Sequence, residues 1–286
     1  MNHNSTARIP DLSSKTITFI GGGNMAASLI GGLIADGYKA KRIIVSDPDG
    51  EKLAGLAARF GIITIGDNSD AVNRADVVVL AVKPQMMKQV VEGIADAAQI
   101  RRPLIVSIAA GVRERELGIW LGGGAALVRT MPNTPAMLQA GATVLHAAPG
   151  VTDDQKSLAE SILRAVGLTC WVDDEEKMDA VTALSGSGPA YFFMVMEAME
   201  EAGKSMGLAA ETARLLTIQT ALGAARMAIE SSDGPAALRW QVTSPGGTTE
   251  RALSILEEGS LRDLFGKALQ GARERSVELS RMLEEK

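Results

Sequence analysis

The amino-acid sequence predicts an α/β domain in the first half of the chain, followed by an all-α domain. Three observations predict this order. Short apolar runs alternate with helix-period segments through the first half. A glycine-rich turn joins the first apolar run to the first helical segment. After about residue 171 the strand pattern disappears, and the remaining segments have helical periodicity.

The first half follows a βαβα order in which the apolar runs are the strands. Strands are expected at residues 16–20, 43–45, 62–64, 77–82, 104–108 and 127–130. Helices are expected between them at residues 25–34, 51–60, 86–94 and 113–121. Continuous apolar runs of this kind are typical of parallel strands that are buried on both faces of a sheet.

The last third of the chain is expected to be helical throughout. Helices are predicted at residues 178–202, 211–230, 235–241, 250–257 and 261–284. In the second of these, Leu215, Ile218 and Leu222 recur at helical spacing, and other faces of the helix are also apolar or small. Burial on several sides indicates either a subunit interface or a central helix within one monomeric bundle.

The length and composition favour two domains and exclude several classes of protein. The chain has 286 residues, 46% of them hydrophobic, which is enough for two cores; the predicted domains are residues 1–170 and 171–286. The net charge is −5 and no dense basic run is present, so binding to nucleic acid is not expected. No apolar run reaches the roughly 18 residues of a membrane-spanning helix. The polar opening residues 1–14 do not resemble a secretory signal, so a cytoplasmic location is expected.

The cysteine and histidine content predicts neither a metal site nor a catalytic triad. The single cysteine, Cys170, has no partner for a disulfide or a zinc site and is interpreted as a small core residue. His3 lies in a polar tail and His146 at the end of an expected strand, with no triad pattern near either. Catalysis by histidine is therefore not expected.

The glycine-rich turn has the pattern of a dinucleotide-binding loop. Residues 21–26 read Gly-Gly-Gly-Asn-Met-Ala, a G-x-G-x-x-A sequence between a strand and a helix. Gly21 permits the tight turn, Gly23 allows a pyrophosphate to approach the backbone, and Ala26 lets the helix pack on the strand. A glycine-rich turn without a ligand is the alternative, but the surrounding βαβ order favours a nicotinamide cofactor.

The end of the second strand leaves the choice between NADH and NADPH open. Asp47 stands where an acidic side chain accepts hydrogen bonds from the ribose 2′-hydroxyl, which favours NADH. Ser46 and the nearby Lys52 are groups that serve a 2′-phosphate equally well. Both cofactors are therefore retained.

Two further strand ends and two hydroxyl-rich loops are candidate ligand sites. Residues 81–84 and 107–111 follow strands and carry small residues that leave room for a nicotinamide; Lys83 is either cofactor-facing or a solvated loop cation. Residues 185–189 and 243–249 precede predicted helices and gather hydroxyls and free N–H groups there. Helix capping alone explains such loops, whereas the second is also suited to a substrate carboxylate.

Together these motifs resemble the pyrroline-5-carboxylate reductase family over nearly the whole chain. The resemblance rests on Phe-Ile-Gly-Gly-Gly-Asn-Met at 19–25, Ala-Val-Lys-Pro at 81–84, Arg-Thr-Met-Pro-Asn-Thr-Pro at 129–135, Ser-Gly-Ser-Gly-Pro-Ala-Tyr at 185–191 and Ser-Pro-Gly-Gly-Thr-Thr at 244–249. It implies an α/β Rossmann-type N-terminal domain followed by an all-α C-terminal dimerisation domain, with subunits that form dimers or rings of dimers. It also implies reduction of 1-pyrroline-5-carboxylate to L-proline, the final step of proline biosynthesis, with NADPH or NADH.

The resemblance and the motifs give a set of expected site residues. Cofactor contacts are expected at Ile20, Gly21, Gly22, Gly23, Asn24, Met25, Ser46, Asp47, Pro48, Asn68, Ala81, Val82, Lys83, Pro84, Ala109, Ala110 and Gly111. Substrate contacts are expected at Glu175, Ser244, Gly246, Gly247, Thr248 and Thr249. Thr249 is the expected catalytic residue, because its hydroxyl is placed to orient the ring nitrogen. Some relatives have an uncharged or basic residue at the position of Asp47. The acidic residue in this chain therefore argues against specific binding of the NADPH phosphate.

The chemistry of an imine explains why no catalytic acid is found. An iminium nitrogen already carries its proton, so hydride transfer to the neighbouring carbon depends on positioning. The rival enzyme class, hydroxyacid and 6-phosphogluconate dehydrogenases, has a catalytic lysine shortly after a G-x-G loop, and here that position is Phe192. A noncatalytic dinucleotide sensor is the second alternative.

Overall fold

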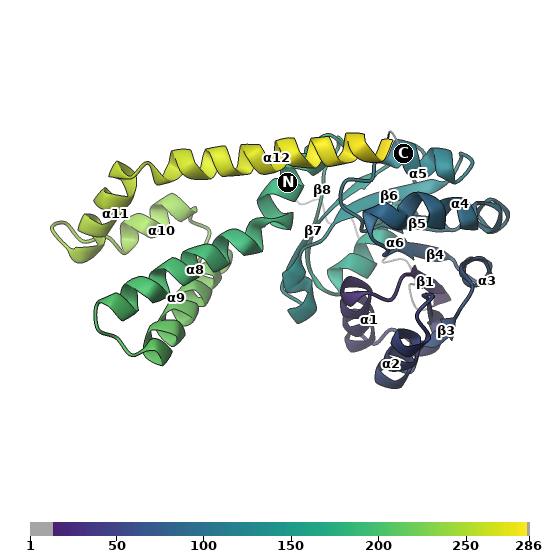
Figure 1. Ribbon diagram of the computed structural model, residues 1–286, viewed down its shortest axis with the longest axis horizontal. Coiled ribbons are helices and arrows are strands. Elements are labelled where there is room, and N and C mark those ends of the chain that lie inside the picture. The colour runs from purple at the N-terminus through teal and green to yellow at the C-terminus, as the bar shows by residue number, and fades with distance from the viewer. Residues whose placement is uncertain (1–13, 285–286) are drawn as a thin grey trace, which may run out of the picture. The chain divides into compact units, whose positions relative to one another are not determined.

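The computed structural model describes residues 14–284, which form two compact units (Figure 1). The first unit runs up to Ser187 and takes in the chain again from Ala272, and the second is Gly188–Gly271. This division differs from the predicted boundary at 170/171. The segment after β8 (Gly167–Trp171) still packs on the sheet of the first unit, since α7 (Lys177–Val181) contacts β7 (Gly141–Ala147).

The first unit is built on one eight-stranded sheet. Its strand order is β3-β2-β1-β4-β5-β6-β7-β8, and all neighbouring pairs are parallel except β6 and β7. The remaining strands are β1 (Ile17–Ile20), β2 (Ile43–Ser46), β3 (Ile63–Ile65), β4 (Val77–Leu80), β5 (Leu104–Ser107) and β6 (Ala126–Met131). The chain reverses its direction of winding between β1 and β4, which is the point where doubly wound sheets bind ligands.

Helices cover both faces of the central strands of this sheet, so these strands are apolar on both sides. Val77 and Val79 belong to the core beneath α1 (Asn24–Ala35), α2 (Gly50–Phe60) and α6 (Asp153–Arg164), whereas Val78 and Leu80 belong to the core on the opposite face. That second core is completed by α3 (Asn68–Val72), α4 (Pro84–Arg101) and α5 (Glu114–Trp120). The alternation of side chains along a strand sends successive valines to opposite cores.

The six predicted strands are confirmed, and the structure adds β7 and β8. Leu168 and Cys170 are exposed on β8, so this strand lies at the sheet edge with one uncovered face. The interpretation of Cys170 as a core residue was therefore wrong. His3 and most of the polar opening segment lie outside the described residues.

The second unit is helical. It contains α8 (Gly188–Ser205), α9 (Ala210–Glu230), α10 (Pro235–Gln241), α11 (Thr248–Glu258) and the start of α12 (Leu261–Glu284), which ends in the first unit. The predicted helix 178–202 is divided, because a π-helical turn at Thr182–Gly186 separates α7 from α8. Two 3-10 helices in the first unit, Ala40–Arg42 and Thr134–Leu138, complete the element order.

Large apolar side chains of the second unit are exposed. Phe192 and Phe193 on α8 have exposed fractions of 68% and 64%, and Leu215, Ile218 and Leu222 on α9 are also exposed. An apolar surface of this extent is typical of a protein interface. These side chains are not covered by a monomeric bundle, which favours the interpretation of α9 as part of a subunit interface.

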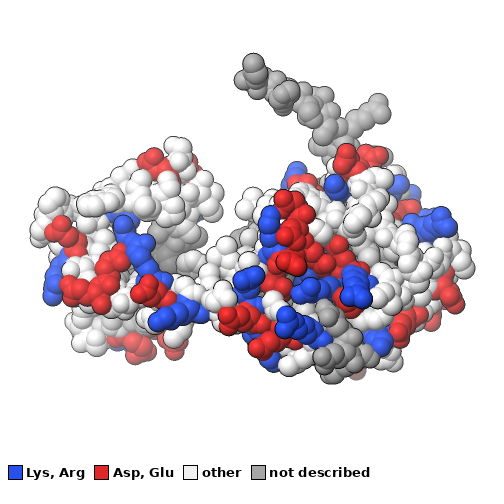
Figure 2. Space-filling view, turned by 90° about the horizontal axis from the view of Figure 1, so that it is seen from above, with Lys and Arg blue, Asp and Glu red and all other residues white. Residues whose placement is uncertain are grey.

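Charged side chains of both signs are mixed on one face of the structure. On the face shown in Figure 2, Lys and Arg lie next to Asp and Glu in both units. Within residues 14–284, no helix combines the length and the apolar character needed to cross a membrane.

Candidate active site

The turn between β1 and α1 forms an open anion-binding cradle. Gly21 has φ of +100°, and a Cβ there would lie 2.8 Å from the Ala81 carbonyl oxygen, so glycine is required. Gly23 is the N-cap of α1 and no side chain caps the helix, while a Cβ on Gly23 would meet nothing within 4 Å. The N–H groups of the first helical turn therefore face open space, and this geometry fits a pyrophosphate.

Three of the predicted cofactor segments meet at this cradle. The Gly21 N–H donates to the Ser46 carbonyl oxygen at 2.8 Å, and the Ala81 N–H donates to the Ile20 carbonyl oxygen at 2.8 Å. The ends of β1, β2 and β4 thus lie together at the carboxyl edge of the sheet. Beside them, α4 begins at Pro84 with Lys83 as its uncapped N-cap residue, and the Lys83 side chain is exposed.

Asp47 points its carboxylate into the glycine loop. Its Oδ2 accepts from the Gly22 N–H at 2.8 Å, its Oδ1 accepts from the Asp49 N–H at 3.0 Å, and the Lys52 ammonium lies within 3.0 Å of both oxygens. Burial alone would raise the pKa of Asp47, but these hydrogen bonds and the Lys52 charge hold that pKa below its ordinary value. The carboxylate is therefore ionised at neutral pH and fully engaged within the protein.

Two further residues predicted to contact the cofactor, Ser46 and Asn68, bind each other. The Ser46 hydroxyl donates to Asn68 Oδ1 at 2.7 Å, and Ser46 has no exposed surface. Asn68 opens α3, directly after its N-cap residue Asp67. This contact connects the end of β2 to α3.

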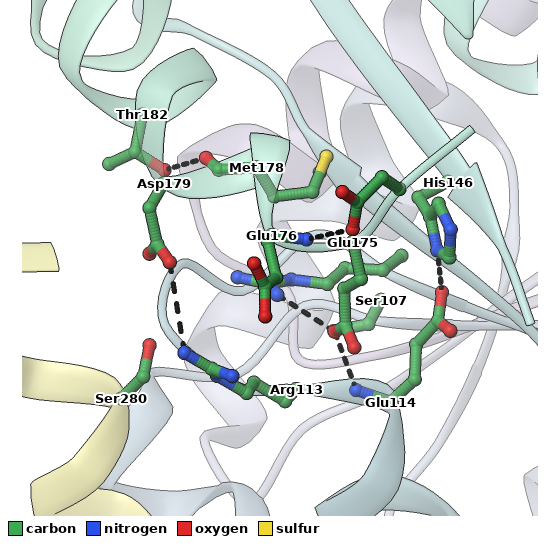
Figure 3. Close-up of polar contacts among 12 residues, drawn as sticks. Ser107, Arg113, Glu114, His146, Glu175, Glu176, Met178, Asp179, Thr182 and Ser280 are labelled. Carbon is green, nitrogen blue, oxygen red and sulfur yellow. Dashed lines mark hydrogen bonds and ion pairs between the residues drawn. The ribbon is translucent and has the colours of Figure 1, made fainter. Parts of the chain in front are cut away.

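A network of buried charges lies behind the loop that follows β5 (Figure 3). Glu175 Oε1 accepts from Arg129 Nη1 and from the Glu114 N–H, each at 2.8 Å. The Glu114 carboxylate lies 2.7 Å from His146 Nδ1. Burial raises the pKa of Glu114, an effect that His146 partly offsets. Arg129 and His146 are register partners on β6 and β7, which places the network on the sheet itself.

A second set of polar contacts connects the same loop to α12. The Ser276 hydroxyl donates to Asp179 Oδ1 at 2.6 Å, and both side chains are buried. Asp179 Oδ2 lies 3.8 Å from Arg113 Nη2, directly before α5 (Figure 3). A Cβ on Gly111 would lie 3.7 Å from the Ser280 hydroxyl. The end of α12 is thus held against the loop at residues 108–113.

A pocket of about 450 Å³ opens beside this loop within the first unit. Its wall includes three residues predicted to contact the cofactor, namely Pro84, Ala110 and Gly111. The opposite wall is largely apolar and comes from α12, through residues such as Leu279 and Met282. The volume is within the range of small-molecule sites.

The predicted substrate loop lies in the second unit, at the start of α11. Gly246 has φ of +69°, and the Gly247 N–H donates to the Ser244 carbonyl oxygen at 3.0 Å, which closes the turn. Gly247 is the N-cap residue of α11, and no side chain caps this end of the helix. The N–H groups of Thr248 and Thr249 therefore have no partner within the helix. The Gly246 N–H donates to Glu250 Oε2 at 2.7 Å. Glu175, the remaining predicted substrate residue, belongs to the first unit.

Sequence reasoning missed most of the buried network. It considered Glu175 only as a substrate ligand, and it did not single out Arg113, Glu114, Asp179 or Ser276. Arg129 was noted only as part of a motif, although a charged residue directly after the apolar residues Leu127 and Val128 of a predicted strand is itself a signal. A buried arginine in a strand requires an acidic partner, and here that partner is 46 residues away.

The first unit has a doubly wound sheet with an open cradle between a strand, a glycine turn and a helix, and the second unit is helical. This combination defines the class of nicotinamide-dependent oxidoreductases. A family model described as NADP oxidoreductase, coenzyme F420-dependent, matches residues 16–111, and one described as pyrroline-5-carboxylate reductase dimerisation matches residues 175–279.

Relatives of known identity agree with both family models. A pyrroline-5-carboxylate reductase of Pseudomonas aeruginosa is 52% identical over 272 residues, which cover 95% of this chain and 99% of the relative. The structure of such a reductase from Coxiella burnetii is 52% identical, with a TM-score of 0.90 over 93% of this chain and 98% of that one. The Plasmodium falciparum enzyme, solved with NADP bound, is 26% identical, with a TM-score of 0.83 over 94% of this chain and 99% of that one.

This chain belongs to the pyrroline-5-carboxylate reductase family. The resemblance drawn from the sequence motifs is thereby confirmed, and so is the predicted order of an α/β Rossmann-type domain and a helical dimerisation domain.

Proposed function

We propose that this protein reduces 1-pyrroline-5-carboxylate to L-proline with NADPH or NADH, as the last step of proline biosynthesis. The observation that carries the proposal is the 52% identity to a pyrroline-5-carboxylate reductase over 95% of the chain, which includes both units. The open cradle at α1 supports it independently, because an uncapped helix N-terminus next to Gly21 and Gly23 suits a dinucleotide.

The first unit holds the cofactor, which supplies a hydride when bound. The N–H groups at the start of α1 bind the pyrophosphate, with Ile20 to Met25 forming the turn around it. Residues 46–48 and Asn68 would bind the adenosine half of the cofactor, and residues 81–84 and 109–111 would bind its nicotinamide half; the Ser46–Asn68 hydrogen bond and the pocket lined by Pro84, Ala110 and Gly111 support this assignment. The largely apolar wall of the pocket beside Ala110 and Gly111 excludes water from the reacting atoms.

The second unit holds the substrate. The uncapped N–H groups of Thr248 and Thr249 bind the substrate carboxylate at the positive end of α11, and Ser244 completes the turn. The Thr249 hydroxyl orients the ring nitrogen, which arrives protonated and loses its positive charge as the neighbouring carbon is reduced. The protein therefore positions two reactants and needs no histidine acid.

Self-association completes the proposal. The exposed apolar residues of α8 and α9 form the contact between two copies of the chain, and dimers associate further into rings. The mixed surface charges support a protein without a nucleic-acid partner, and the family relationship to bacterial enzymes supports a cytoplasmic location. Sedimentation velocity on the purified chain measures the assembly; a monomer at micromolar concentration would refute the contact.

The activity test follows the loss of NADH or NADPH absorbance after addition of 1-pyrroline-5-carboxylate, with a control without the imine. Rapid imine-dependent oxidation is the expected result. Binding of the cofactor without any turnover would instead identify a dinucleotide sensor. A hydroxyacid dehydrogenase is disfavoured, because Phe192 occupies the position of its catalytic lysine.

The role of Thr249 is tested by a matched pair of substitutions. Thr249→Ala removes the hydroxyl and is expected to lower kcat roughly 10- to 100-fold, while Thr249→Ser retains the hydroxyl and most of the activity. Equal kinetics for the alanine variant and the unchanged enzyme would exclude Thr249 from the reaction.

A further inference from the structure

The carboxylate of Asp47 has little capacity left for a ribose. Asp47 is 6% exposed, and its two oxygens accept the N–H groups of Gly22 and Asp49 and contact the Lys52 ammonium at 2.9 and 3.0 Å. A carboxylate offers about four acceptor positions, and these four contacts fill them. A ribose diol that bound Asp47 would have to displace one of its internal partners.

We infer that Lys52, held in place by Asp47, is the residue that sets the preference of this enzyme for NADPH over NADH. The inference rests on the proposed function, since it concerns the adenosine side of the same cofactor site. It reverses the expectation that the acidic residue at this strand end selects NADH.

The charges of the pair support this assignment. An ionised Asp47 without a partner would repel the 2′-phosphate of NADPH, because both groups are negative. The Lys52 ammonium neutralises Asp47 at hydrogen-bond distance, and the lysine side chain is 40% exposed. An ammonium has three donors, so at least one remains for a phosphate oxygen after two are used on Asp47.

The neighbouring hydroxyl is not an alternative phosphate ligand. Ser46 has no exposed surface, and its hydroxyl donates to Asn68. Lys52 lies in the first turn of α2, and Asp49 is the N-cap residue of that helix. The Asp49 side chain accepts a hydrogen bond from the Lys52 N–H at 3.0 Å. Both ends of Lys52, its backbone N–H and its ammonium, are therefore fixed next to the end of β2.

The test is a binding experiment on the full chain by isothermal titration calorimetry with NADP⁺ and NAD⁺. Lys52→Met is expected to weaken NADP⁺ binding roughly 10- to 100-fold and NAD⁺ binding less than about threefold, because one charge-assisted hydrogen bond is lost. Lys52→Arg is expected to keep the order of the two affinities. Lys156→Met removes the same charge from an exposed pair on α6 and is expected to change neither.

The aspartate provides the opposing result. Asp47→Asn is expected to weaken NADP⁺ binding more than NAD⁺ binding, because the neutral amide no longer holds the Lys52 ammonium in place and contacts no ribose. Selective loss of NAD⁺ binding in that variant would identify Asp47 as the ribose ligand and overturn the inference. An equal loss of both nucleotides in Lys52→Met, or no loss, would also overturn it.

The same preparation separates this inference from the proposed function. The unchanged protein is assayed with 1-pyrroline-5-carboxylate and each reduced cofactor in parallel with the titrations. Failure of turnover with normal nucleotide binding contradicts the reductase assignment alone. Normal turnover with equal loss of both nucleotides in Lys52→Met contradicts the role of Lys52 alone.

Discussion

Replacement of Glu175 by alanine is expected to destabilise the first unit by about 3 kcal/mol. One carboxylate oxygen, Oε1, accepts both the Arg129 guanidinium and the Glu114 N–H at 2.8 Å. Arg129 is only 3% exposed, so the alanine variant leaves a buried positive charge and a backbone N–H without an acceptor. Glu175 itself is 24% exposed, and the resulting solvent screening places the loss at the lower end of the range for broken buried pairs.

Glu175→Gln separates the charge from the hydrogen bonds. The amide oxygen still accepts both donors, and only the negative charge is removed, so the expected loss is about 1 to 2 kcal/mol. Glu176→Ala is the matched control, because the neighbouring Glu176 is exposed and is not one of the partners in the two hydrogen bonds to Glu175 Oε1. Urea unfolding followed by circular dichroism, at one fixed protomer concentration, measures all three variants.

The outcome also decides between two roles of Glu175. If Glu175 binds the substrate, as the family resemblance implies, Glu175→Gln lowers kcat/KM for the imine and leaves the unfolding midpoint unchanged. If Glu175 supports the loop before α5, both variants unfold earlier, and alanine has the larger effect. An alanine variant within about 1 kcal/mol of the unchanged protein would refute the reasoning from the buried arginine.

Two further carboxylates give predictions of their own. Glu250 accepts from the Gly246 N–H at 2.7 Å, where its negative charge competes with and repels a substrate carboxylate. Glu250→Gln is therefore expected to lower the KM for the imine roughly two- to fivefold without altering the KM for NADPH. An increase in the KM for the imine would contradict this reasoning. Burial raises the pKa of Glu114 above its ordinary 4.5, so its contribution to stability is complete below that pH and is lost as the pH rises through the folded-state pKa. The unfolding free energy of Glu114→Gln minus that of the unchanged protein should thus increase from about pH 4 to about pH 8, and a difference independent of pH would exclude the effect.

Regular burial made the central sheet predictable from the sequence. The valines of β4 are apolar in succession because helices cover both faces, and that pattern is visible in any such strand. At the sheet edge the pattern changes, since β8 leaves Leu168 and Cys170 exposed and carries Thr169 between them. A short edge strand with one open face has neither the continuous apolar run nor a polar outer face that would identify it.

The cofactor cradle was also predictable, because its elements are contiguous. Gly21, Gly23 and Ala26 follow β1 closely in the sequence, and each of these positions requires a small residue for a local steric reason. The direction of a side chain is not contained in such a pattern. The sequence placed Asp47 at the end of β2, but the carboxylate turns to Gly22 and Lys52, and only the packed structure gives that direction.

The buried network could not be predicted, because its partners are distant in sequence. Arg129 and Glu175 are separated by 46 residues, and Asp179 and Ser276 by 97. Both pairs act on residues next to one loop: Glu175 accepts the Glu114 N–H, and Asp179 lies beside Arg113. This loop follows Ala109 to Gly111, the segment proposed to hold the nicotinamide.

The placement of these charges agrees with the chemistry of imine reduction. A protonated imine needs no acid at the reacting atoms, so the ionisable groups of the first unit are free to fix the backbone instead. Glu175 is bound by Arg129 and Asp179 is bound by Ser276, while the pocket beside Gly111 has a largely apolar wall from α12. The rate advantage of such a site depends on how precisely the loop is held, since small misplacements of reacting groups are costly. A loosened network should therefore reduce kcat before it reduces the affinity of the cradle at α1 for the cofactor, because that cradle is built by the ends of β1, β2 and β4.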